Sequence, residues 1–184
     1  MKNKIMIIGC GGIGSFLIPL LDRVDMYDIT VFDPDIVETK NLTYQNFDSD
    51  EVGMNKAEAL AVSYNFKPQP YKVLTPEQIS GYDLVICCAD NLDVRKMMYK
   101  SEITWLDLRA QGRAGLLVSS DEDPKLYSTL TAGPEGSFSC QGDAWDKSNQ
   151  GVHFTHVAVA GYGAQWVQRH FAGDYTPKHI QVSA

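Results

Sequence analysis

Residues 5–14 read IMIIGCGGIG, a short apolar run followed by a glycine-rich turn. An apolar run of this length that ends in glycines is typical of a buried parallel strand, and residues 13–23 then carry a helical pattern. Gly9 and Gly11 allow the backbone to bend and to approach a phosphate, and Gly14 allows the helix to pack close to the strand. Because the first N–H groups of such a helix face outward, the stretch predicts an anion-binding turn between a strand and a helix.

The pattern beyond this turn indicates one class of fold. Further strands are expected at residues 29–32, 69–73, 84–88, 105–108 and 116–119, and helices at residues 55–64, 90–99 and 154–171. This alternation predicts an α/β fold: a Rossmann-like, doubly wound, mainly parallel sheet with helices on both faces. With 184 residues, of which 44% are hydrophobic, we expect a single domain over residues 1–184, with one loop-rich segment at 121–150.

Charge and cysteine content exclude several classes of function. A formal net charge of −7 and the lack of a basic cluster argue against nucleic acid as a partner. The four cysteines do not form the framework of a secreted disulfide protein, so we expect a reducing cytoplasm. The apolar stretch before Cys10 is shorter than the roughly 7–15 residues of an export signal, and no run of about 18 apolar residues follows. A soluble protein without a membrane partner is therefore expected.

Asp33 follows Gly14 by nineteen positions, at the end of the second expected strand. An acidic residue at this place usually holds a ribose hydroxyl, in NAD-binding and ATP-binding proteins alike. An NAD-dependent oxidoreductase is therefore one alternative. It is disfavoured because the sequence shows no Tyr-x-x-x-Lys and no hydride-transfer His–Asp pair, and because Lys56 and the pair Asp90-Asn91 would have no role.

Four segments resemble one family. They read GCGGIGS at residues 9–15, DPDIVETKNLTYQ at 33–45, GMNKAE at 53–58, and YDLVICCADN at 82–91 with Arg95 after it. Over residues 1 to about 120 the chain resembles the ThiF/MoeB/HesA branch of the ubiquitin-activating-enzyme-like superfamily. The resemblance implies an ATP-dependent adenylyltransferase that activates the terminal glycine carboxylate of a small ubiquitin-like or sulfur-carrier protein ending in Gly-Gly and releases pyrophosphate. It also implies a homodimer.

The same resemblance implies a role for individual residues: Asp33 holds the ribose, Asn41 and Lys56 contact phosphates, and Asp90 binds magnesium. The cofactor-binding set that it implies for ATP and Mg²⁺ is Gly9, Gly11, Gly12, Gly14, Asp33, Asn41, Leu42, Tyr44, Gln45, Lys56, Asp90 and Asn91. The chemistry asks for these residue types as well. Attack of a carboxylate on the α-phosphorus brings negative groups together, so a lysine and a metal ion must neutralise charge. One Asp is sufficient for Mg²⁺, which usually keeps several waters.

Departures from the family pattern bear on activity more than on fold. Tyr44 stands where the family usually has an arginine, and the chain starts directly in its first strand, without a leading helix that carries an arginine. Candidate substitutes for the missing cation are Arg23, Arg95, Arg109 and Arg113. The alternative function is therefore a nucleotide-binding partner subunit or pseudoenzyme. Only one cysteine follows Cys88, which excludes a zinc site of four thiolates.

Cys140 could expose a thiolate to an acyl-adenylate and act as a catalytic acyl acceptor. A remnant of a lost zinc site and an ordinary loop thiol are equally good interpretations. Cys87 and Cys88 lie in an apolar run and are expected to be core residues. His153 and His156 flank the start of the last helix, where hydrogen bonding at the helix end is a more common role than metal binding.

Overall fold

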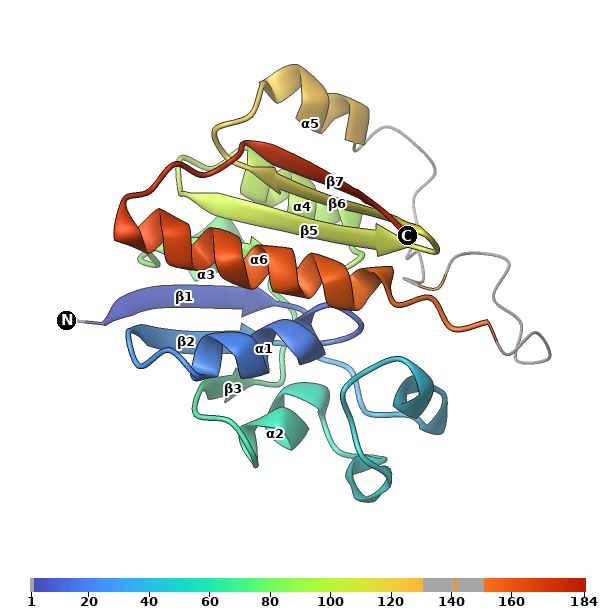
Figure 1. Ribbon diagram of the computed structural model, residues 1–184. Helices are drawn as coiled ribbons and strands as arrows, with labels where there is room; N and C mark the ends of the chain where they lie inside the picture. Colours follow the sequence, from blue (N-terminus) through green and yellow to red (C-terminus); the bar gives the residue numbers. More distant parts are fainter. Residues whose placement is uncertain (1, 131–140, 142–150) are drawn as a thin grey trace.

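A single seven-stranded sheet forms the centre of the computed structural model, which describes residues 2–130, 141 and 151–184 (Figure 1). The strands are β1 (Asn3–Ile8), β2 (Tyr27–Phe32), β3 (Lys67–Gln69), β4 (Leu84–Cys87), β5 (Trp105–Gln111), β6 (Ala114–Ser119) and β7 (His179–Ser183). Their spatial order is β3-β2-β1-β4-β5-β6-β7. Strands β1 to β5 pair in parallel, whereas β6 and β7 are added antiparallel.

The strand order reverses at β1. The chain leaves β1 for β2 and β3 on one side, and it then returns to β4 on the other side of β1. At such a switch point the connections leave in opposite directions, so the carboxyl ends of the two strands border a crevice in which ligands bind. The glycine turn follows β1, and Asp90 follows β4. The topology therefore places both motifs at one edge of the sheet.

Helices cover both faces of the sheet (Figure 1). Helices α1 and α6 lie over one face, and α3 and α4 lie over the other. The helices are α1 (Gly14–Asp22), α2 (Lys56–Ala61), α3 (Pro76–Ile79), α4 (Leu92–Tyr99), α5 (Pro124–Leu130) and α6 (Thr155–Ala172), with 3₁₀ turns η1 (Thr39–Thr43) and η2 (Ser49–Glu51). The predicted doubly wound α/β fold is confirmed.

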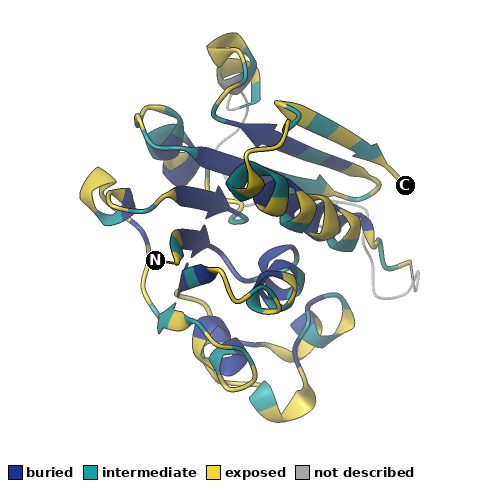
Figure 2. Cartoon of the chain, turned by 60° about the vertical axis from the view of Figure 1, so that its left-hand side comes forward, coloured by how far each residue is buried: buried dark blue, intermediate teal, exposed yellow. Residues whose placement is uncertain are grey.

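Two hydrophobic clusters explain why β1 is apolar from Ile5 to Ile8, after the polar residues Asn3 and Lys4 at its start. Ile5 and Ile7 belong to the cluster under α1 and α6, whereas Met6 and Ile8 belong to the cluster under α4. Successive side chains of a strand point to opposite faces, so a central strand between two helical layers needs apolar residues at every position. Figure 2 shows the result as an inner band of buried strands, with exposed residues on the outer helices.

Four segments differ from the sequence-based expectation, one of them the short helix α3 (Pro76–Ile79), which was not expected. The strand expected at 69–73 is β3 (Lys67–Gln69), because Pro70 has no N–H to continue the ladder. Within the segment expected to be loop, 121–150, residues Pro124–Leu130 form α5, whose start is capped by Asp123 accepting from Lys125 N at 2.9 Å. Strand β7 was not expected; its residues alternate between exposed and half-buried on the edge of the sheet.

Two further properties of the described residues concern membrane-spanning helices and disulfide bonds. No helix in the described ranges is long and apolar enough to cross a lipid bilayer. Cys10, Cys87 and Cys88 are free thiols. Cys87 lies in the core, as expected, and its burial raises its pKa to about 11. Cys88 follows β4 and is only partly buried, which corrects the expectation that it lies inside the strand.

The glycine turn leaves no room for side chains at two positions. Gly9 has a φ of +91°, and a Cβ there would lie 2.8 Å from the backbone nitrogen of Ala89. A Cβ on Gly14 would lie 2.1 Å from the carbonyl oxygen of Gly9. The turn is thus packed between the residues that follow β4 and the start of α1. At both positions the atom nearest to the added Cβ is a backbone atom.

Replacing Gly14 by alanine should therefore destabilise the protein. Because the clashing atom is backbone, the turn itself must move, and we expect the free energy of unfolding to fall by about 1–3 kcal/mol. Gly161 in α6 is the matched control, since nothing lies within 4 Å of a Cβ there. Gly161→Ala should be neutral or stabilise by about 0.5–1 kcal/mol. Urea denaturation measures both, and equal stability of the two variants would contradict the packing described for the turn.

Candidate functional site

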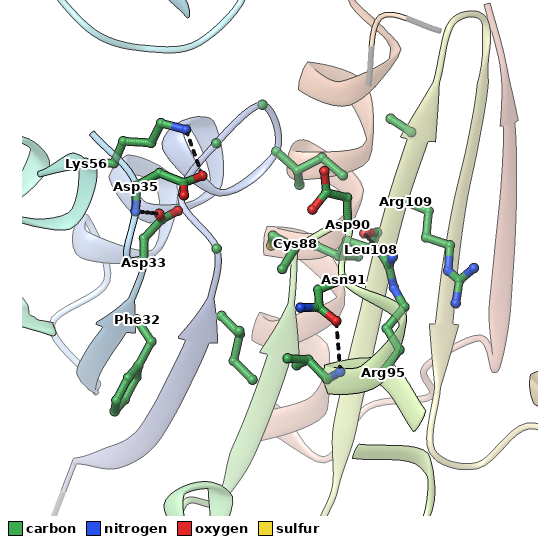
Figure 3. A pocket seen from close by; sticks show the side chains of 18 of the residues that line it. Phe32, Asp33, Asp35, Lys56, Cys88, Asp90, Asn91, Arg95, Leu108 and Arg109 are labelled. Carbon is green, nitrogen blue, oxygen red and sulfur yellow. Dashed lines mark hydrogen bonds and ion pairs between the residues drawn. The ribbon is translucent and has the colours of Figure 1, made fainter. Parts of the chain in front are cut away.

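A cavity of about 1130 Å³ opens at the carboxyl edge of the parallel strands (Figure 3). Its volume is sufficient for a nucleotide and part of a second molecule. All but two of the residues that the sequence assigned to a nucleotide site line this cavity: Gly9, Gly11, Gly12, Asp33, Asn41, Tyr44, Gln45, Lys56, Asp90 and Asn91. The two exceptions, Gly14 and Leu42, do not line the cavity and pack under the residues that do. Gly14 packs on the turn, and Leu42 packs against the hydrophobic core.

Asp33 joins the glycine turn to the end of β2. Its Oδ2 accepts a hydrogen bond from Cys10 N at 2.7 Å, and its Oδ1 accepts one from Asp35 N at 2.9 Å. Burial raises the pKa of this carboxyl group, although the two N–H groups and the nearby Lys56 ammonium act in the opposite direction. Each oxygen still has a lone pair for a ligand hydroxyl.

Asn55 fixes the start of α2 against the same strand end. Its Nδ2 donates to the carbonyl oxygens of Asp33 at 2.8 Å and Asp35 at 3.0 Å, while its Oδ1 caps α2 by accepting from Ala57 N at 2.9 Å. A helix capped in this way begins at a defined point. Lys56, the first residue of α2, is therefore placed by the backbone of Asp33 and Asp35, directly after β2.

Lys56 carries a nearly buried ammonium at the edge of the cavity. Its side chain is 9% exposed, and Nζ lies 3.4 Å from Oδ2 of Asp35, whose side chain is 66% exposed (Figure 3). A contact of this length to a hydrated carboxylate is weak, and a buried ammonium is costly without good partners. Lys56 therefore suits an anion that enters the cavity.

The segment after η1 carries Tyr44 and Gln45 over the glycine turn. Asn46 N donates to Ser15 Oγ at 3.0 Å, which ties the segment to α1. Gln45 is 9% exposed, lies near Gly11, and its Oε1 has no partner among the described residues. A buried amide without a partner is costly, so Gln45 is suited to bind a ligand.

Tyr44, where the resemblance leads us to expect an arginine, lines the cavity beside Asn41 and His156. Its ring is perpendicular to that of buried His156, with centroids 6.4 Å apart, and its hydroxyl lies 3.5 Å from Nδ2 of Asn41. Burial lowers the pKa of His156, which favours a neutral ring. His156 is thus a packing residue in the first turn of α6 and adds no cation to the cavity.

Asp90 and Asn91 have separate roles after β4. Asn91 is the cap of α4, because its Oδ1 accepts from Asp93 N at 2.8 Å. Asp90 is exposed at the cavity wall and does not cap the helix. Across the described ranges, no three His, Cys, Asp or Glu side chains gather in a way that could hold a metal ion. A Mg²⁺ ion brought by phosphates needs only one such carboxylate.

A buried charge cluster forms the far wall of the cavity. Asp107 is fully buried on β5, and its two oxygens accept from Arg95 Nε at 2.8 Å and from Arg109 Nε at 2.7 Å. The Tyr99 hydroxyl also donates to Asp107. Burial alone would raise the pKa of Asp107, but the two guanidinium groups outweigh it and hold this pKa below its ordinary value.

This cluster is the part of the site that the sequence indicated least well. Arg95 and Arg109 were candidate cations, and both line the cavity, whereas Arg23 and Arg113 do not. Asp107 was not singled out, although a charged residue inside the apolar run at 105–108 was a possible signal. Cys140 lies outside the described residues.

Comparison with known proteins identifies a family that matches most of the chain and solved structures with a similar fold. The model of the ThiF family matches residues 1–164. Ubiquitin-like modifier-activating enzyme 5 of Aedes aegypti is 28% identical over 116 residues, which cover 51% of this chain and 29% of that protein. Adenylyltransferase and sulfurtransferase UBA4 of Candida glabrata is 28% identical over 161 residues, which cover 76% of this chain and 37% of that protein.

Among solved structures, E. coli MccB with ATP superposes with a TM-score of 0.70 and 18% sequence identity, covering 99% of this chain and 60% of that chain. At this identity the likeness concerns the fold. The chain spans less than two thirds of the length of each of these relatives.

Replacing Asp107 by asparagine should cost about 3–5 kcal/mol, because two guanidinium groups would lose their buried counter-charge. The folded-state pKa of Asp107 is lowered, so its contribution is complete above the ordinary aspartate pKa of about 3.9 and is lost as the pH falls through the folded-state value. The difference from the wild type should therefore be full at pH 7 and shrink in acid. Asp25→Asn is the control, since that side chain is 94% exposed and its loss should change little. Denaturant unfolding at several pH values measures the free energy of unfolding of both variants. If the difference between Asp107→Asn and the wild type did not depend on pH, a lowered pKa of Asp107 would be contradicted.

Proposed function

The chain belongs to the ThiF family, and on that premise we propose that it transfers the adenylyl group of ATP to the terminal carboxylate of a ubiquitin-like or sulfur-carrier protein ending in Gly-Gly. The observation that carries the proposal is the nearly buried ammonium of Lys56, which shares one cavity with the glycine turn, Asp33 and Asp90. A cation, a phosphate-binding turn and a metal-binding carboxylate are the parts that phosphoryl chemistry requires.

Each residue has a defined task in this proposal. Asp33 accepts from the ribose hydroxyls with its remaining lone pairs, and the turn at Gly11 and Gly12 presents backbone N–H groups to the phosphates. Gly9 bends the chain, because its own N–H donates to the carbonyl oxygen of Phe32 at 2.8 Å. Gln45 supplies a buried amide oxygen, Oε1, that lacks a partner among the described residues and can accept from an N–H or O–H of the nucleotide. Asn41, Tyr44 and Asn91 complete the walls around the nucleotide.

The reaction forms one bond and breaks one. An oxygen of the substrate carboxylate attacks the α-phosphorus, the bond from that phosphorus to the bridging oxygen breaks, and pyrophosphate leaves with the electron pair. Lys56 neutralises charge on the phosphate oxygens, which is the contribution that matters most in a reaction between anions. Asp90 would hold Mg²⁺, which supplies further charge neutralisation when bound.

The names of two relatives support the reaction class, since one is called an activating enzyme for a ubiquitin-like modifier and the other an adenylyltransferase. Because the chain spans only part of them, their activities are transferred here as a proposal. We also propose a homodimer in the reducing cytoplasm, with neither nucleic acid nor membrane as a partner.

One observation favours a second function. Tyr44 packs edge-on to a neutral His156, so the cation that the family places here is absent and is not supplied by the neighbouring ring. A nucleotide-binding partner subunit or pseudoenzyme that works with a fuller homologue is therefore the alternative. An NAD-dependent oxidoreductase is not favoured by any side chain in the cavity.

Cys140 is retained as the proposed acyl acceptor, because it is the only cysteine after Cys88. Its thiolate would attack the acyl carbon of the adenylate, form a thioester and release AMP. With ATP and a carrier, a thiol-sensitive conjugate should appear on non-reducing gels and be lost in Cys140→Ser. Cys87→Ala is the control: Cys87 lies in the core outside the cavity and its burial raises its pKa to about 11, so the conjugate should persist. An unchanged conjugate in Cys140→Ser would remove the acceptor role.

The adenylation itself is tested by exchange of labelled pyrophosphate into ATP, dependent on a carrier that ends in Gly-Gly. Loss of a preorganised charge contact costs about 10²–10³ in rate, so Lys56→Ala should reduce exchange by at least this factor, and Asp90→Ala should abolish it. Tyr44→Arg should raise exchange or leave it unchanged. Lys67→Ala is the control, because Lys67 is 65% exposed and pairs with Asp28 away from the cavity. Exchange that appears only after a second homologous subunit is added would favour the partner-subunit function.

A further inference from the structure

The cavity continues past β4 to a second wall that the nucleotide contacts leave unused. This wall is built from β5, β6 and the end of α5, and its lining includes Arg109, Ala110, Ala114, Leu116 and Leu130. Figure 3 shows Lys56, Asp35 and Asp33 on one side of the cavity, with Asp90 and Arg109 on the other. Apart from Arg109 and Gln111, the side chains that β5, β6 and α5 contribute to this wall are apolar, and Arg109 is its one charged residue among the described residues of these elements, so the wall suits an unbranched chain with an anionic group.

Arg109 is held in one orientation by three contacts. Its Nε donates to Asp107 Oδ2 at 2.7 Å, Nη1 donates to the carbonyl oxygen of Leu130 at 2.9 Å, and Nη2 donates to the Tyr99 hydroxyl at 2.7 Å. A guanidinium has five N–H donors, so these contacts engage three of them and leave one on each terminal nitrogen. The side chain is 20% exposed and lines the cavity. Arg109 is thus a preorganised fork at the cavity wall.

The charges of the cluster do not cancel. Asp107 is one carboxylate shared between two guanidinium groups, so the cluster carries a net positive charge. Arg95 is 7% exposed at its side chain and its Nη2 lies 3.4 Å from the carbonyl oxygen of Leu108, which turns it inward. The excess positive charge is therefore available at Arg109, on the wall opposite Lys56.

We propose that Arg109 is a specificity-determining residue that binds the terminal carboxylate of the second substrate, with Asp107 and Tyr99 as positioning residues. The inference rests on the proposed function, because it assigns the acceptor end of the same cavity. A guanidinium fork matches a carboxylate in geometry and charge better than a single ammonium does. One carboxylate oxygen would be held by Arg109 while the other faces the α-phosphorus near Asp90.

A purely structural role for Arg109 makes a different prediction. If Arg109 only neutralised Asp107, its replacement would reduce stability and would affect every ligand of the cavity equally. If Arg109 binds the carboxylate, its replacement should weaken the carboxylate ligand and spare the nucleotide. Affinity for two ligands therefore separates the roles.

The test uses calorimetry on the full chain saturated with Mg²⁺ and a non-reactive α,β-methylene analogue of ATP. The probes are a short peptide ending in Gly-Gly with a free carboxylate and the same peptide as its C-terminal amide. The wild type should bind the acid about 10- to 100-fold more tightly than the amide, as expected for a charge-assisted hydrogen bond. Arg109→Gln should lose this preference and keep its affinity for the nucleotide analogue within about threefold. Arg109→Lys should keep part of the preference, and Arg113→Gln, an exposed arginine outside the cavity, should keep all of it.

A wild type that binds both peptides equally, or neither, overturns the proposal even if Arg109→Gln fails to fold. An acid preference that survives in Arg109→Gln overturns it as well. A preference that depends on Arg109 in a protein without pyrophosphate exchange would uphold the carboxylate site and reject the proposed reaction, so the two failures can be told apart.

Discussion

The hydrogen bond from Cys10 N to Asp33 is the contact on which the rest of the site depends. It joins the glycine turn after β1 to the end of β2 inside the protein, where the carboxylate is 5% exposed. The same strand end receives both hydrogen bonds of the Asn55 amide and so fixes the start of α2. The turn, the acidic residue and Lys56 are therefore positioned by one short stretch, Asp33 to Asp35, directly after β2. Their mutual geometry follows from hydrogen bonds between side chains and backbone within the protein.

The electrostatics of the cavity follow from this arrangement. Asp33 is buried beside Lys56 and keeps a raised pKa, which shows that the desolvation of its charge outweighs the nearby cation. On the far wall the balance is reversed, because two arginines face Asp107 and lower its pKa. The same residue type thus shifts in opposite directions according to how many cations it meets. One wall of the cavity carries Asp33 and Asp35 beside Lys56, and the far wall carries a net positive charge.

The sequence predicted the first half of the fold better than the second. The buried part of β1 (Ile5 to Ile8) and all of β4 lie between two helical layers, so these positions are apolar and the runs are visible without tertiary information. The glycine turn and Asn91 act locally, and local spacing was sufficient to find them. Asp107 meets Arg95 and Tyr99 only when β5 packs against α4. No short sequence pattern therefore predicts this ion pair with Arg95 or the hydrogen bond from Tyr99. Strand β7 pairs with β6 across more than sixty positions of the chain, and its alternating exposure is a weak signal on an edge.

Because Tyr44 carries no charge, the proposed reaction must draw its cations from other residues of the cavity. Cations on the far wall cannot replace the missing family arginine, because Arg95 is turned toward Asp107 and Leu108 and Arg109 stands opposite the phosphate side. Charge on the leaving pyrophosphate must then be neutralised by Lys56, the N–H groups of the glycine turn and a metal ion at Asp90. The nearly buried Lys56 is suited to this role, because its ammonium would interact more strongly with a phosphate in the cavity than with the exposed Asp35 carboxylate at 3.4 Å. With tyrosine at position 44, the proposed reaction would depend more heavily on Lys56, and the cations Lys56 and Arg109 on opposite walls suit the proposed binding of two anions that are held apart until they react.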